Sequence, residues 1–202
     1  MPSTICSNEP PVGAAPRSLL SKLCRKLLID VMGWSIVTDQ PMPPKYVACL
    51  APHTSNWDFV VGMLYSRAED VRCNFLMKKE WFFWPVGPLM RRIGGIPVDR
   101  DRHTSLTDRL ASIAEESETF RLCVTPEGTR SPNPDWKMGF YYIAQKARIP
   151  ILLYALDYGK KAIVCTKTIV PNGDVRAQMR EIKLYFKDFK GKHPENFVLG
   201  DY

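Results

Sequence analysis

A histidine and an aspartate five residues apart are the first side chains in the sequence whose types suit acid–base chemistry. His53 follows an apolar run and Pro52, and Asp58 lies where a helix opens with a cap signature at Ser55. On one continuous helix, at about 100° per residue, the two side chains would lie on different faces. We therefore expect the chain to bend His53 back over the helix start, so that Asp58 orients the imidazole as a base. For this pair alone, a surface histidine beside a helix cap is the alternative.

A five-residue loop from Pro126 to Arg130 has the composition of an anion site. It follows the apolar run at 121–125 and reads Pro-Glu-Gly-Thr-Arg. The glycine permits close approach of a phosphate, and the guanidinium of Arg130 can donate two parallel hydrogen bonds to it. A plain loop with a surface ion pair is the alternative interpretation of these residues.

A third segment, from Gly94 to Arg100, offers a second cation. Its two glycines predict a bend that leads into a short strand at 96–98. Arg100 then either lies in solvent beyond that strand or serves as a second ligand for the same anion.

Strands and helices alternate along the chain and must bring these segments together. Apolar runs bounded by turn residues predict strands, and a helical apolar period predicts helices. The expected strands are 45–51, 73–77, 96–98, 121–125, 149–157 and 161–168. The expected helices begin near Ser55, run from Ser105 to about Phe120 and from Gly139 to Ala147, and finish with one that has Val175, Met179, Ile182 and Phe186 on one face. This alternation predicts a single-domain layered α/β fold with a central mixed sheet flanked by helices.

Residues 17–34 predict an amphipathic helix ahead of the sheet. Its apolar face carries leucines, and its polar face carries Lys22, Arg25 and Lys26. Such a helix can lie on an anionic bilayer or pack on its own protein, and both interpretations stay open. Residues 1–16, rich in proline and small side chains, predict a flexible lead-in to a domain formed by 17–202.

Composition narrows the class of protein. With 202 residues, 45% of them hydrophobic, the chain can form one domain with a buried core. Its net charge of +7 is consistent with an acidic partner such as phosphate, anionic lipid or an acidic carrier protein, and equally with a basic surface exposed only to solvent. No apolar run reaches the roughly 18–20 residues that span a membrane, and the first residues lack a signal-peptide pattern. Six cysteines without a CxxC pair and three scattered histidines favour neither a disulfide framework nor a metal site.

The motif segments, in this order, resemble the glycerolipid acyltransferases, the family of glycerol-3-phosphate and lysophosphatidic acid acyltransferases. The family has the blocks H-x-x-x-x-D, G-x-[FI]-x-[IV]-x-R and P-E-G-T-R, which match residues 53–58, 94–100 and 126–130. Its fourth block, V-P-[IV]-x-P, matches from Ile149 to Leu152, but Leu153 replaces the closing proline. The resemblance covers roughly residues 45–157.

The resemblance implies a role for each matched residue. His53 would be the general base and Asp58 its orienting partner, with no covalent intermediate on the enzyme. Arg130 and Arg100 would bind a phosphate on the acceptor. The loop residues that would hold the acceptor are Glu127, Gly128, Thr129 and Arg130.

The implied activity is transfer of a fatty acyl chain from acyl-CoA or an acyl carrier protein to the hydroxyl of 1-acylglycerol-3-phosphate. The product would be phosphatidic acid, in phospholipid biosynthesis. Another lyso-lipid, such as a lyso-phospholipid or an amino-acid-containing lipid, is an alternative acceptor, and a non-catalytic lipid-binding protein is the alternative from another class. The resemblance implies no cofactor, no nucleic acid, and peripheral contact with an anionic membrane on its cytoplasmic face.

Four consecutive aromatic residues, Trp81 to Trp84, have more than one interpretation. Their density favours a place in the core. The alternatives are the wall of an acyl channel and a position at the level of lipid headgroups.

Overall fold

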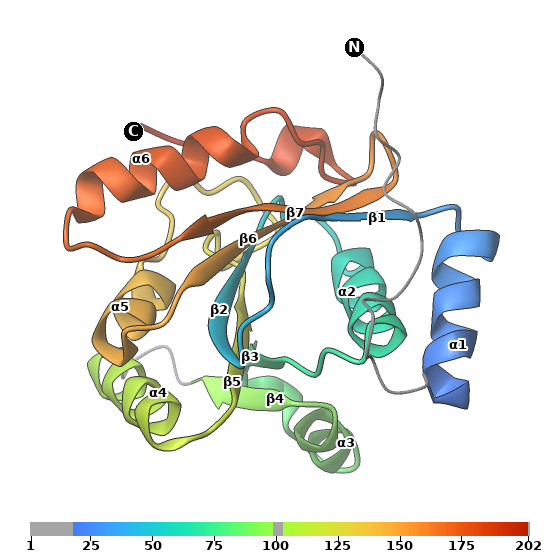
Figure 1. Ribbon diagram of the computed structural model, residues 1–202, viewed down its shortest axis with the longest axis horizontal. Coiled ribbons are helices and arrows are strands. Elements are labelled where there is room, and N and C mark those ends of the chain that lie inside the picture. Colours follow the sequence, from blue (N-terminus) through green and yellow to red (C-terminus); the bar gives the residue numbers. More distant parts are fainter. Residues whose placement is uncertain (1–17, 99–102, 202) are drawn as a thin grey trace.

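A seven-stranded sheet lies at the centre of the computed structural model, which describes residues 18–98 and 103–201 (Figure 1). In spatial order the strands are β1 (Ser35–Thr38), β7 (Ala162–Ile169), β6 (Ile151–Asp157), β2 (Lys45–Leu50), β5 (Phe120–Val124), β3 (Asn74–Lys78) and β4 (Gly95–Val98). Neighbouring strands are parallel except for β6 and β7, which are antiparallel. The predicted layered α/β fold with a mixed sheet is confirmed.

Helices cover both faces of this sheet. They are α1 (Leu19–Lys26), α2 (Trp57–Ala68), α3 (Val86–Arg92), α4 (His103–Glu116), α5 (Gly139–Ala147) and α6 (Val175–Phe186). Figure 1 shows α4 and α5 on one side of the sheet and α1 and α2 on the other. Buried side chains of α6 share the cluster of α4 and α5, so α6 covers that same face.

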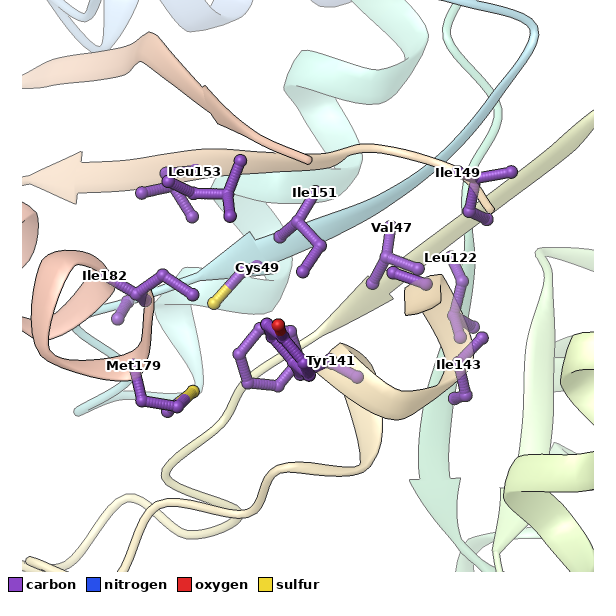
Figure 2. Packing of buried hydrophobic residues seen from close by; sticks show 14 of the residues in the cluster. Val47, Cys49, Leu122, Tyr141, Ile143, Ile149, Ile151, Leu153, Met179 and Ile182 are labelled. Carbon is purple, nitrogen blue, oxygen red and sulfur yellow. The ribbon is translucent and has the colours of Figure 1, made fainter. Parts of the chain in front are cut away.

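The strand sequences explain why the central strands are buried on both faces. Successive side chains of a strand point to opposite faces, and β2 places Val47 and Cys49 in one apolar cluster and Tyr46 and Ala48 in the other. Figure 2 shows the first cluster, in which side chains from the strands meet those of α5 and α6. Strands packed on both faces have nearly continuous apolar sequences, which is why they stand out in this chain.

The prediction that the helix starting at Ser105 ends near Phe120 is wrong at its C-terminal boundary. Helix α4 stops at Glu116, and Phe120 is the first residue of β5. The backbone N–H of Phe120 donates to the carbonyl of Pro44, which begins the pairing of β5 with β2. Strand pairing therefore overrides the apolar period that continued the helix.

The aromatic segment lies largely at the surface, so its interpretation as core is wrong. Trp81, Phe83 and Trp84 are exposed, with Trp84 at 84%. The chain turns tightly here: a Cβ on Gly87 would lie 2.5 Å from the carbonyl oxygen of Phe82. This turn leads into α3 and leaves three of the four rings exposed to solvent.

Helix α1 packs on α2 and leaves a row of leucines exposed. The Ser21 hydroxyl donates to the carbonyl of Ala68 at 2.8 Å, and Leu28, in the π-helical turn after α1, is fully buried. The exposed apolar residues of this stretch are Leu19, Leu20, Leu23, Leu27 and Val31. Across the described residues, none of the helices has both the length and the apolar character needed to cross a membrane.

Candidate active site

His53 and Glu127 meet because they follow neighbouring parallel strands. Strand β2 pairs with β5 in a register that sets Cys49 opposite Val124, so the two strands end at the same edge of the sheet. His53 follows the end of β2, and Glu127 follows the end of β5. Sites in α/β proteins commonly lie at this carboxyl edge. The His53–Asp58 segment and the loop at 126–130 are thereby brought together.

The expected bend between His53 and Asp58 is present. Residues 51–54 are irregular, and Asp58 lies in the first turn of α2. His53 Nδ1 lies 3.1 Å from Asp58 Oδ2. Because an ionised carboxylate only accepts hydrogen bonds, Nδ1 donates this one, and Nε2 of the neutral ring is left to accept a proton. The His53 side chain is 18% exposed, so a substrate can reach it.

The buried carboxylate of Asp58 is held by two backbone donors besides the imidazole. The N–H groups of Thr54 and Ser55 donate to Oδ2 at 2.8 Å and 3.0 Å. The bond from the Ser55 N–H matches one half of the predicted cap signature, in which a side chain in the first turn reaches back to the backbone before the helix, although the N-cap residue of α2 is Asn56. These hydrogen bonds compensate for the loss of solvation of the buried Asp58 carboxylate, and they fix its orientation toward His53.

Glu127 points inward beneath His53. Its side chain is 2% exposed, and its Oε1 accepts the backbone N–H of His53 at 2.8 Å. Burial raises the pKa of this carboxyl to about 8, the hydrogen bond from His53 opposes the rise, and the charge of Asp58 adds to it. Glu127 therefore fixes the backbone of the base, a role that the sequence motif alone does not reveal.

Replacing Glu127 by glutamine should flatten the pH dependence of stability between about pH 5 and pH 8. The ordinary pKa of the carboxyl is 4.5 and its pKa in the folded protein is about 8. Within that window the folded state binds a proton that the unfolded state has released, so stability falls as the pH rises. Glutamine keeps an acceptor for the His53 amide and does not titrate. Melting temperatures of both proteins at the two pH values test this: we expect the wild type to lose several degrees more than the variant, and equal losses would contradict it.

An open polar hollow of about 370 Å³ lies beside the base. It is lined by Thr54, Ser55, Asn56, Arg130, Ser131, His193 and Asn196. Arg130 is exposed here, so its guanidinium can reach an anion that enters from solvent. The hollow is thus lined by the residues that directly precede α2, by the loop at 126–131 and by a segment near residue 193.

The remaining residues of the motif loop form its turn. Gly128 has φ of +67°, a left-handed conformation that suits glycine. The Thr129 hydroxyl accepts the N–H of Ser131 at 3.3 Å. Arg100, expected as a second anion ligand, and the expected lead-in at 1–16 lie outside the described residues.

A segment from Lys190 to His193, which the sequence did not indicate, packs behind the base. The N–H of His193 donates to Thr54 Oγ1 at 3.1 Å. A Cβ on Gly191 would lie 2.6 Å from that same oxygen. Only glycine fits this close approach to Thr54. The backbone N–H of Thr54 in turn donates to Asp58. Within 18–98 and 103–201, no three His, Cys, Asp or Glu side chains are grouped to hold a metal ion.

The sequence profile of the family described as Acyltransferase matches residues 36–156, which include His53, Asp58 and the loop with Glu127 and Arg130. The chain belongs to the acyltransferase family. It is therefore an enzyme that transfers an acyl group.

One solved structure shows the fold of this acyltransferase in another protein. The crystal structure of PlsC, the 1-acyl-sn-glycerophosphate (LPA) acyltransferase of Thermotoga maritima, is similar with a TM-score of 0.50 and 18% sequence identity. The similarity covers 80% of this chain and 73% of that chain. A comparison with curated proteins finds no match.

Proposed function

We propose that this acyltransferase moves a fatty acyl chain from an acyl thioester to the free hydroxyl of 1-acylglycerol-3-phosphate, giving phosphatidic acid. The observation that carries the proposal is the His53–Asp58 pair, whose neighbours Thr54 and Ser55 line the same hollow as Arg130. The family supplies the class of reaction, and the cation in the hollow favours an acceptor with an anionic headgroup. The Thermotoga maritima protein, a 1-acyl-sn-glycerophosphate acyltransferase, is named for such an acceptor.

The proposed reaction is a direct displacement. His53 Nε2 takes the proton of the acceptor hydroxyl as that oxygen attacks the thioester carbonyl. The tetrahedral intermediate then expels the thiolate, which takes up the proton from the imidazolium. Asp58 stabilises the imidazolium while it exists, as the carboxylate of a catalytic triad does. The new ester and the free thiol are the products, and no acyl group is attached to the protein.

The loop that follows β5 would bind the acceptor. Gly128, Thr129 and Arg130 hold it at the surface of the loop, and Arg130 binds its phosphate together with Arg100. Glu127 takes part from beneath through the amide of His53. The donor is acyl-CoA or an acyl carrier protein, and the protein's positive charge suits either of these acidic molecules.

Thiol release from a long-chain acyl-CoA tests the function. The reaction is run without acceptor, with lysophosphatidic acid, and with monoacylglycerol, which lacks the phosphate. We expect release to require lysophosphatidic acid, and Arg130→Ala to raise the KM for this acceptor. The matched variant Arg176→Ala, at an exposed position of α6, should leave that KM unchanged.

Four results would change the proposal or make it more specific. Equal rates with both acceptors would remove the phosphate from recognition. Release with another lyso-lipid alone would change the acceptor, and release from an acyl carrier protein thioester alone would identify the donor. No release with any of these would favour a lipid-binding protein without catalysis.

We propose that α1 holds the enzyme on the cytoplasmic face of an anionic membrane. Its exposed leucines lie beside exposed Lys22 and Lys26, a pattern typical of helices at the bilayer interface. The described cysteines are free thiols, as expected in a reducing compartment.

Leu23→Glu should weaken binding to vesicles of phosphatidylcholine and phosphatidylglycerol. Leu23 is 63% exposed, so a charge there costs the fold little but opposes burial in lipid. Leu184→Glu, at a leucine on α6 that is 42% exposed, is the matched control. Co-sedimentation with vesicles measures both, and equal binding by the two variants would place the membrane contact elsewhere.

A further inference from the structure

A third strand, on the other side of β2, also delivers a side chain to the base. Strand β6 is parallel to β2 and ends at Asp157, so Tyr158 emerges at the carboxyl edge of the sheet. Strands β5, β2 and β6 are adjacent, and they are followed by Glu127, His53 and Tyr158. The base is thus flanked by residues from both neighbouring strands.

The Tyr158 hydroxyl binds Oδ1 of Asp58, the carboxylate oxygen that receives none of the hydrogen bonds described above. It donates to Oδ1 at 2.8 Å. The imidazole and two backbone N–H groups all bind Oδ2. With donors on Oδ2 alone, the carboxylate can turn about its terminal torsion, which is a soft one. A donor on Oδ1 restricts that rotation.

The surroundings of Tyr158 keep its hydroxyl in this position. Its ring packs edge-on against Trp34, with centroids 5.0 Å apart, and its N–H donates to the carbonyl of Lys190 at 2.8 Å. Burial, and then the charge of Asp58, raises the pKa of the phenol above its ordinary value. The hydroxyl therefore stays protonated at neutral pH and is available as a donor.

We propose that Tyr158 is a positioning residue for acyl transfer: its hydroxyl locks Asp58 so that the carboxylate keeps His53 aligned toward the acceptor. The inference rests on the proposed roles of His53 and Asp58. Tyr158 lies two residues beyond the family match, which ends at residue 156.

Tyr158→Phe should lower kcat about tenfold and leave both KM values within about twofold, because a hydrogen bond to a charged group is lost while the substrate contacts remain. The phenylalanine ring retains the packing against Trp34. Tyr185→Phe is the matched control, because the Tyr185 hydroxyl contacts Thr166 instead of the catalytic pair. The control should keep the wild-type kcat. A wild-type kcat in Tyr158→Phe would overturn the proposal.

A double-mutant cycle separates positioning from a general loss of structure. If the hydroxyl acts through Asp58, its removal should have little further effect once Asp58 is alanine, which leaves the hydroxyl no side-chain partner at that position. The same fold-loss in both backgrounds would overturn the proposal.

A second readout does not depend on turnover. The downfield NMR signal of the His53 Nδ1 proton should broaden in Tyr158→Phe and persist in Tyr185→Phe. An unchanged signal in Tyr158→Phe would overturn the positioning role even if no acceptor is turned over. Absence of turnover in the wild type, with the NMR difference present, would instead count against the proposed function.

Discussion

Replacing His53 by alanine should lower kcat for thiol release by about 10³-fold at saturating thioester and acceptor. The variant retains the backbone N–H that Glu127 binds, so the anchor between the two strand ends persists. It removes the one imidazole that Asp58 orients, and the attacking hydroxyl then loses its base. Binding of either substrate does not depend on this proton transfer, so the KM values should change little.

The fold should survive this change. The His53 side chain is partly exposed and packs no core cluster, so we expect the melting temperature to stay within about 3 °C of the wild type. A loss of tenfold or less in a folded variant would mean that another group takes the proton, and the proposed mechanism would then be wrong.

Asp58→Asn should lower kcat by about 10²- to 10⁴-fold. An amide oxygen in the place of Oδ2 can still accept the N–H groups of Thr54 and Ser55. The amide nitrogen then faces the Tyr158 hydroxyl, which can rotate to accept instead of donate. The hydrogen bonds are therefore replaced one for one, but the negative charge that stabilises the imidazolium is gone.

The measurement is kcat with thermal unfolding of the same preparation. Asp174→Asn is the matched control: Asp174 caps α6 through the N–H of Ala177, and asparagine caps helices about as well. We expect wild-type activity and stability in that control. Turnover in Asp58→Asn close to that of the control, with normal unfolding, would refute the catalytic pair.

Strands buried on both faces were predictable from sequence, whereas the edge strand β1 and the short helix α3 were not. Strands β2, β5 and β6 are apolar at nearly every position because helices cover both of their faces. Strand β1 has four residues, half of them exposed, and its partner β7 lies more than 120 residues further along the chain. Helix α3 contains glycine and proline, which argue against a helix locally. Pairing and packing over long distances decide both elements.

The contact between His53 and Asp58 was predictable because its geometry is local, whereas the contacts that support it were not. His53 and Asp58 lie five residues apart, so a cap signature and a strand end suffice to bring them together. The bond from Tyr158 to Asp58 spans 100 residues, and the bond from His193 to Thr54 spans 139. Burial of Glu127 also depends on the whole fold. Hints were present in the sequence, since Tyr158 directly follows an apolar strand, but only the sheet order shows which strand ends are neighbours.

The central position of β2 in the sheet separates His53, which follows this strand, from the edge strands. In the order of seven strands, β2 is the fourth, with three strands on either side. Opening of a folded protein starts where contacts are fewest, and the outer strands of a sheet fray before its middle. Fluctuations that loosen β1 or β4 must therefore pass through two further strands before they disturb the one that carries His53. The edge strands β1 and β4 can therefore fluctuate in solution while the distance between the His53 imidazole and the Asp58 carboxylate is preserved.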